Sequence, residues 1–159
     1  MTSAVALFSS LFGSASADAP AECAFRLEES KGELTHPVQS VEPTKDGRFL
    51  NYTVEATEPV RAVGCGTVKN VTFLTGFGQS LILSHGEGLQ TVYGGLSRTQ
   101  VRTGQVVEAG QVIALVDPEG RHDALIFGIW ANGDAVNPAE WVAPFPVEEA
   151  SRSIQGGAR

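Results

Sequence analysis

Short apolar runs separated by glycine-rich turns dominate residues 81–116 of the chain. The first two runs, LILSH and LQTVYG, are mostly apolar or alternate between apolar and polar side chains. In the stretch that follows, VRTGQVVEAGQVIALV, Gly104 and Gly110 lie six residues apart on either side of a valine pair. Runs of this length with such regular turns predict about three or four short β-strands rather than helices.

The same pattern continues on both sides of this block. Residues 48–56 (RFLNYTVEA) alternate between two sets of side chains, which predicts a half-buried strand. Residues 60–75 predict two strand pieces that meet at a Gly-Cys-Gly turn, and residues 124–131 (ALIFGIWA) predict a mostly apolar strand. Residues 138–141 (PAEW) predict a single helical turn that begins with proline. No longer helix is indicated, so we expect an all-β sandwich or barrel.

Length and charge restrict the classes of function. The chain has 159 residues, which suits one domain, and its 11 basic and 18 acidic residues give a net charge of −7. Nucleic-acid binding requires a basic face, and an anionic membrane repels an acidic protein. No stretch reaches the ~20 apolar residues that span a membrane as a helix. We therefore expect no nucleic-acid partner and no stable membrane span.

The amino-terminal segment carries a targeting pattern. Residues 1–17 combine an apolar run with small residues and an A-x-A site, which is typical of a secretory signal peptide. No Lys or Arg precedes Arg26, so a disordered tail, or a start within a longer signal, is the alternative. We predict a signal peptide (1–17), an acidic linker (18–30), one domain (31–145) and a flexible tail (146–159). The predicted location is periplasmic or secreted.

Two cysteines, Cys23 and Cys65, are present in the chain. In an exported protein they could form a disulfide that closes a long loop and contributes roughly 3–4 kcal/mol. In a reducing compartment they would be two unrelated thiols. Neither belongs to a Cys-x-x-Cys metal-binding motif.

The order and spacing of six segments carry a resemblance to a known family. The segments are KGELTHPV, PVRAVGCGTV, GFGQSLILSHGEGLQTVYGGLS, VRTGQVVEAGQVIALV, LIFGIW and NPAEWV. Together they resemble the LytM/lysostaphin-type metallopeptidase domain, also called the duplicated hybrid motif, over roughly residues 31–142. The resemblance implies a barrel-sandwich of short antiparallel strands. Biotinyl and lipoyl carriers share the fourth segment, but Lys69 lacks the sequence context of a carrier lysine.

The resemblance implies that active members of this family are zinc hydrolases. In them a His-x-x-x-Asp pair supplies two metal ligands, and a His-x-His pair supplies a third ligand and a catalytic histidine. Three protein ligands hold such a metal and leave one position open for the water that it activates. In this chain the resemblance places the first pair on Phe49 and Thr53, or on Asn51 and Glu55 if the register shifts by two. Neither register supplies the histidine.

The other positions at which active family members carry histidine also hold different residues in this chain. The His-x-His pair falls on Ala124 and Ile126, and a further histidine of active members falls on Gly95. His85 matches a histidine that the family keeps beside its glycine turn, which is not a metal-ligand position. We therefore expect a groove without a metal and without a cofactor.

The remaining histidines and the aromatic residues have structural interpretations. We expect His85 to be a hydrogen-bonded structural residue and His36 to be exposed. His122, with Asp123 and Glu119, could rebuild a metal site only in part, because the facing strand offers a single carboxylate. The aromatic residues of the last third of the chain are expected to pack in the core or beneath a lid rather than form a sugar platform; they are Phe127, Trp130, Trp141 and Phe145.

These observations predict a catalytically inactive member of the family. The resemblance to EnvC-type and NlpD-type murein hydrolase activators implies that its groove binds and activates an N-acetylmuramoyl-L-alanine amidase, or another murein hydrolase, in cell-wall remodelling or cell separation. One alternative is a module that binds peptidoglycan or an envelope protein without activating it. A zinc murein endopeptidase is the least favoured, because no ligand set is in place.

Overall fold

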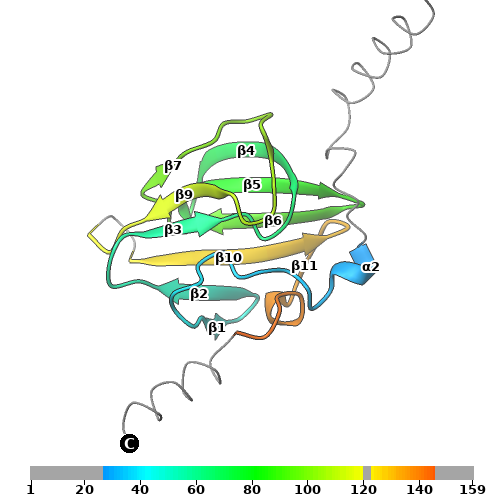
Figure 1. Cartoon of the computed structure of the whole chain (residues 1–159), viewed down its shortest axis with the longest axis horizontal. Coiled ribbons are helices and arrows are strands. Elements are labelled where there is room, and N and C mark those ends of the chain that lie inside the picture. The colour runs from blue at the N-terminus through cyan, green and yellow to red at the C-terminus, as the bar shows by residue number, and fades with distance from the viewer. Residues whose placement is uncertain (1–26, 120–122, 146–159) are drawn as a thin grey trace, which may run out of the picture.

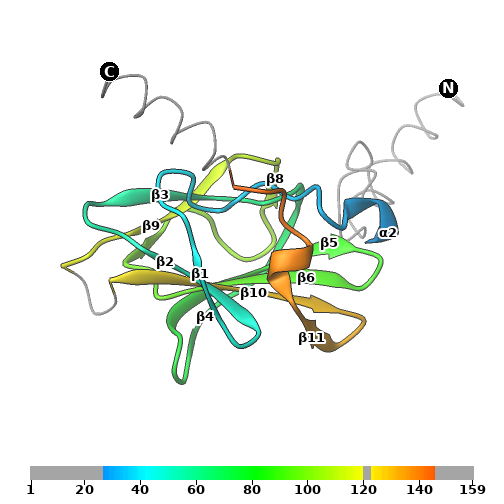
Figure 2. The same ribbon diagram turned by 90° about the horizontal axis from the view of Figure 1, so that it is seen from below.

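Two antiparallel β-sheets pack face to face in the computed structural model, which describes residues 27–119 and 123–145 (Figure 1). The larger sheet has eight strands in the order β1 (Thr44–Asp46), β2 (Phe49–Thr53), β10 (Ala124–Ala131), β6 (Leu89–Gly94), β5 (Gly78–Gly86), β4 (Gly66–Leu74) and β8 (Val106–Val107), with β11 (Asp134–Val136) paired to β10. The smaller sheet has the order β3 (Glu58–Arg61), β9 (Val112–Val116) and β7 (Arg98–Thr99). Figure 2 shows the smaller sheet on one side of the larger sheet. The predicted all-β fold is confirmed.

Helices are short in the described part of the chain. They are the four-residue helix α2 (Leu27–Ser30) and the 3-10 turn η1 (Pro138–Glu140), which confirms the predicted single turn beginning with proline. Across residues 27–119 and 123–145, no helix has the length and apolar character needed to cross a bilayer.

The core lies between the two sheets, and strand alternation explains which side chains enter it. On β2, Leu50 and Tyr52 are buried, whereas Phe49 and Asn51 are only half-buried and Thr53 is exposed. Successive side chains of a strand point to opposite faces, so β2 directs the first set inward and the second set outward. We call the outward side of the larger sheet, which faces away from the smaller sheet, the outer face.

The paired turns around Gly104 and Gly110 repeat one design. Each glycine has a φ near 90°, at 92° and 84°, which L side chains rarely adopt. In each turn the glutamine after the glycine forms two hydrogen bonds that close the loop. The Gln105 and Gln111 backbone N–H groups donate to the carbonyls three residues earlier, and their side-chain oxygens accept the N–H groups of those same residues. The glycine–glutamine pairs of the sequence are therefore structural.

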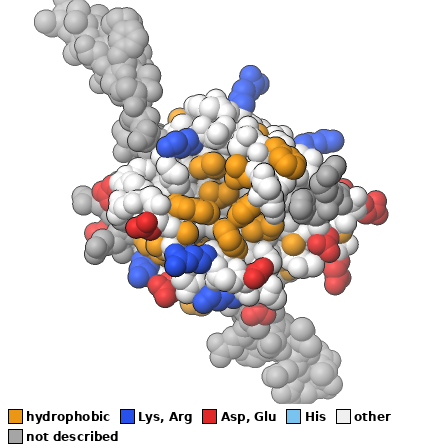
Figure 3. All heavy atoms as spheres, turned by 180° about the vertical axis from the view of Figure 1, so that it is seen from behind, with side chains coloured by type: hydrophobic (Ala, Val, Ile, Leu, Met, Phe, Trp, Pro, Cys, Tyr) orange, Lys and Arg blue, Asp and Glu red, His pale blue; other side chains and the backbone are white. Residues whose placement is uncertain are grey.

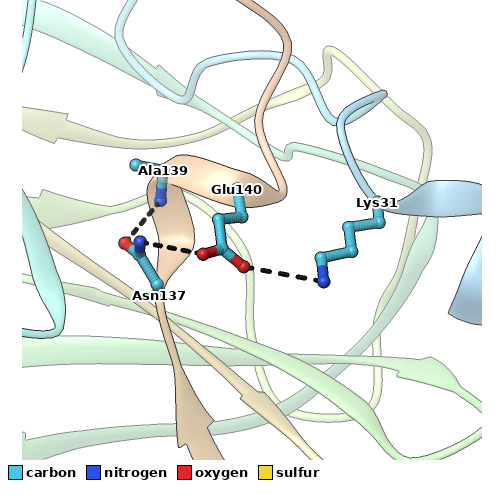
Figure 4. A network of polar contacts seen from close by, with 4 residues as sticks. All are labelled: Lys31, Asn137, Ala139 and Glu140. Carbon is cyan, nitrogen blue, oxygen red and sulfur yellow. Dashed lines mark hydrogen bonds and ion pairs between the residues drawn. The ribbon is translucent and has the colours of Figure 1, made fainter.

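The 3-10 turn η1 is held by its own cap and by a link to the amino-terminal segment (Figure 4). The Asn137 side-chain oxygen accepts the Ala139 N–H at 3.2 Å, and its amide donates to Glu140 at 3.4 Å. Lys31 Nζ lies 3.5 Å from the Glu140 carboxylate, with both side chains more than half exposed. Exposed pairs of this kind contribute little, at most about 1 kcal/mol.

The predicted exposure of His36 is wrong, because the carboxyl-terminal segment covers this residue. His36 is 8% exposed. Its Nε2 lies 2.8 Å from the Ala143 carbonyl and its Nδ1 lies 2.7 Å from the Tyr52 hydroxyl. The Phe145 ring packs edge-on against the imidazole at a centroid distance of 5.0 Å. Since a carbonyl only accepts, Nε2 carries the proton, and burial lowers the pKa of His36.

Candidate functional site

The sequence-derived groove positions lie together on the outer face, because β10 pairs with both β2 and β6. Thr53 lies opposite Ala124, and Asn51 lies opposite Ile126. On the other side of β10, Ile126 lies opposite Gly94, the residue before the predicted position Gly95. The two sets of positions at which the resemblance places metal ligands therefore lie side by side on paired strands.

An aromatic cluster of Phe49, Phe77 and Trp130 lies on the outer face beside these positions. The Phe49 and Phe77 rings meet edge-on with centroids 5.0 Å apart, and the Phe49 and Trp130 rings lie 6.1 Å apart. The rings pack directly against the backbone of two glycines, which have no side chain in the way. A Cβ added at Gly128 would lie 2.9 Å from Phe49 and Trp130, and a Cβ added at Gly94 would lie 2.9 Å from Phe77. The cluster thus depends on two glycines in neighbouring strands.

Both registers considered for the first metal pair fall on β2 or directly after it. Phe49 and Thr53 begin and end β2 and share its outer face. In the alternative register Asn51 lies on the same face of β2, and Glu55 lies just beyond the end of the strand and is exposed. Gly95 has a φ of 77°, which L side chains rarely adopt, and it donates its N–H to the Phe77 carbonyl at 2.5 Å.

Metal-binding side chains do not gather in the described part of the molecule. Among residues 27–119 and 123–145, no group of three or more His, Cys, Asp and Glu side chains is placed to hold a metal ion. His122, the centre of the partial site considered from sequence, lies outside the described residues. Its neighbours Asp123 and Glu119 are exposed.

A cavity of about 380 Å³ lies beside the aromatic cluster, and we call it the outer cavity. It is lined by Leu74, Thr75, Phe77, Ile82, Gln90, Val92 and Trp130. Hydrophobic side chains gather in the middle of the molecule's rear face, which is the outer face (Figure 3).

The aromatic residues predicted to pack in the core divide into two groups. Trp141 and Phe127 are buried, at 6% and 0% exposure, which confirms the prediction for them. Trp130 instead lies half-exposed on the outer face, because it has the same strand parity as Ile126. Phe145 is half-buried against His36.

Comparison with known proteins identifies the family. A profile of Peptidase family M23 matches residues 48–138, more than half of the chain. The chain belongs to Peptidase family M23. The solved structure of a putative family M23 peptidase from Pseudomonas aeruginosa superposes on it with a TM-score of 0.63 and 26% identity, covering 70% of this chain and 51% of that structure.

Curated relatives of this M23 domain include an activator and an enzyme. The murein hydrolase activator EnvC of Escherichia coli K12 is 39% identical over 90 residues, which cover 55% of this chain and 21% of EnvC. The DD-carboxypeptidase/endopeptidase Mpg of Neisseria meningitidis serogroup B is 28% identical over 123 residues, which cover 76% of this chain and 28% of Mpg. The chain therefore spans less than a third of the length of the curated relatives it matches.

His85 is a structural residue of the M23 domain, as predicted. It is fully buried, and burial lowers its pKa to about 4. Its Nδ1 lies 2.6 Å from the Cys65 carbonyl, which only accepts, so Nδ1 donates and the neutral ring accepts the Thr91 hydroxyl proton at Nε2 over 2.8 Å. The Thr91 oxygen lies 2.9 Å from the Tyr93 hydroxyl, which accepts the Val63 N–H at 3.2 Å. This buried chain joins β5 and β6 to the segment between β3 and β4, away from the outer face.

Cys65 is disulfide-bonded in the structure. Cys23, the other cysteine of the chain, lies outside the described residues. Their pairing stays a prediction.

Proposed function

We propose that this chain is a non-catalytic member of Peptidase family M23 that binds a murein hydrolase on its outer face and activates it. The observation that carries the proposal is the position of Phe49, where the resemblance places the first metal ligand. A phenyl ring has no lone pair to offer a metal, and this ring packs against Phe77 and Trp130. The other ligand positions, Thr53 and Ile126, also lack imidazole and carboxylate groups.

The groove chemistry suits a protein segment better than a hydrolytic reaction. The outer face combines half-buried apolar side chains such as Ile126 with the short polar side chains Asn51 and Thr53. Apolar grooves with a few polar groups recognise amphipathic helices and extended peptides. The similarity to EnvC, which is named a murein hydrolase activator, supports a hydrolase as the source of that segment. An N-acetylmuramoyl-L-alanine amidase in the periplasm or outside the cell is the partner we propose.

Activation requires a difference in affinity between two states of the partner. A chain that bound the open and closed states of the amidase equally would shift nothing, however tightly it bound. A tenfold shift toward the open state requires about 1.4 kcal/mol of preference. The groove supplies this preference if the segment that it binds is released only when the amidase opens.

The test is amidase-dependent release of dye from labelled sacculi in the presence of groove variants. Ile126→Lys places a charge in the groove, and we expect it to lower activation by about tenfold or more. Val106→Lys is the matched control, because Val106 is 51% exposed on the edge strand β8, and we expect activation within about twofold of wild type. Co-sedimentation with sacculi without activation of any amidase would favour the non-activating module. Zinc-dependent release by the chain alone would favour a peptidase like Mpg.

A further inference from the structure

The outer cavity is distinct from the positions at which the resemblance places metal ligands. Its lining residues come from the β4–β5 hairpin and from the outward positions of β5, β6 and β10, whereas Phe49 and Thr53 belong to β2. Most of its surface is apolar, and the flanking side chains of Leu74, Ile82 and Trp130 are only half-buried. A volume of about 380 Å³ falls in the range of ligand-binding pockets, so an aromatic or long aliphatic side chain can enter it.

The opposite end of the groove is acidic. Asp123 precedes β10 and Glu55 follows β2, and these two segments are joined by the hydrogen bond from the Val54 N–H to the Asp123 carbonyl at 3.0 Å. Figure 3 shows acidic side chains on both sides of the hydrophobic patch on this face. We call Glu55 and Asp123 the acidic end.

The two features are separated by the length of β10. Ala124 lies beside the acidic end, and Trp130 lines the outer cavity six residues later. At about 3.3 Å per strand residue this separation is roughly 20 Å. A partner helix covers the same distance with about 13 residues.

We infer that the outer face recognises a partner segment at two points, with a large apolar side chain in the outer cavity and basic side chains at the acidic end about 20 Å away. The inference rests on the proposed function for the class of partner and adds the chemistry and spacing of the segment that is bound. A second copy of this chain is a poor occupant, because the net charge of −7 makes copies repel one another. A cationic amphipathic segment complements both ends of the groove.

The first experiment measures binding and stimulation of the murein hydrolase by variants of the full chain. Thr75→Arg places a long charged side chain at the mouth of the outer cavity from an exposed position, and we expect the dissociation constant to rise about tenfold or more. Phe73→Arg is the matched control, since Phe73 lies on the same hairpin, is 63% exposed and does not line the cavity. Glu55→Lys with Asp123→Lys tests the acidic end, and Glu33→Lys with Glu108→Lys is its charge-matched control.

The second experiment uses a synthetic probe and does not depend on the hydrolase. A labelled 14-residue helical peptide carries a tryptophan at one end and three lysines at the other, is made in both sequence directions, and is compared with peptides that have glutamate in place of lysine. We expect one lysine peptide to bind wild type with a dissociation constant below about 1 mM, and Thr75→Arg and the Glu55→Lys/Asp123→Lys chain to weaken it. Binding equal to that of the glutamate peptides, binding unaffected by either variant, or no binding up to about 1 mM would overturn the inference.

The two experiments separate the inference from the proposed function. If wild type stimulates the hydrolase and Thr75→Arg and the charge-reversed chain do so equally well, the two-point site is wrong while the activator function stands. If wild type stimulates no hydrolase but the lysine peptide binds and responds to the variants, the activator function is wrong while the two-point site stands.

Discussion

Replacing Gly128 with alanine should destabilise the protein through the aromatic cluster. The added Cβ would lie 2.9 Å from ring atoms of Phe49 and Trp130, whereas carbon atoms pack best at about 3.5–4.0 Å. An overlap of roughly 0.6–1 Å on two rings at a buried position belongs to the range of overpacking, about 1–3 kcal/mol. In a strand without such contacts, the same change would instead stabilise by roughly 0.5–1 kcal/mol, because glycine loses more backbone entropy on folding.

The assay is a double-mutant cycle of urea unfolding curves with Gly128→Ala and Phe49→Ala. Removing the Phe49 ring frees space for the new methyl group and lets the Trp130 ring move. We therefore expect Gly128→Ala to cost less by about 1 kcal/mol or more in the Phe49→Ala background than in wild type. An equal cost in both backgrounds would refute the idea that Phe49 packs on the Gly128 backbone.

Three further predictions concern stability. Burial lowers the pKa of His36, and lowers that of His85 to about 4, below the 6.5 of the unfolded chain. The unfolded chain therefore binds more protons below pH 6.5, and the free energy of unfolding should fall between pH 6.5 and about 4, with His85 contributing up to about 1.4 kcal/mol per pH unit; a flat urea midpoint between pH 7 and 5 would contradict this. Tyr93→Phe leaves the buried Val63 N–H without its partner and should cost about 1–3 kcal/mol in urea unfolding, so a neutral effect would exclude this hydrogen bond. Lys31→Ala should cost at most about 2 kcal/mol in thermal unfolding, since its ion pair with Glu140 is exposed and its Nζ lies 5.9 Å from the Trp141 ring centroid, and a larger loss would contradict this.

Local patterns in the sequence predicted the strands and the alternation of side chains between the two faces of β2. The alternation of Leu50 and Tyr52 with Phe49 and Asn51 has the period of a strand, and burial in the structure follows it. The same reasoning could have placed Trp130, because it shares strand parity with Ile126, an outward-facing groove position. The apolar run ALIFGIWA favoured a core position instead, since a mostly apolar strand does not show which of its faces is solvated.

Contacts between segments that are distant in the sequence explain the burial of His36 and the packing of Phe77, which sequence patterns did not predict. The exposure predicted for His36 rested on its place before Pro37, which indicates extended backbone but not that the Ala143–Phe145 segment folds over it. Phe77 appeared as part of a Gly-Phe-Gly turn. Its ring packs in the groove because Gly94 and Gly128, on two neighbouring strands, leave bare backbone there. Sequence patterns report the backbone preference of a turn and not the destination of its side chain.

The two faces of the larger sheet have different roles in this account. The inner face is closed by the core and by the His85–Thr91–Tyr93 hydrogen bonds, which fix β5 and β6. The outer face carries aromatic, aliphatic and short polar side chains at the positions where the resemblance places family metal ligands, and these positions lie on paired strands. Family membership therefore explains the framework, and the side chains of the outer face explain why we propose a regulator.

Dye release from labelled sacculi, measured with the purified chain in the presence of zinc, with and without a cognate amidase, tests the central claim most directly. We expect no release by the chain alone and release with the amidase well above that of the amidase alone. Release by the chain alone that is abolished by a chelator would contradict the account, and so would an amidase whose activity the chain leaves unchanged.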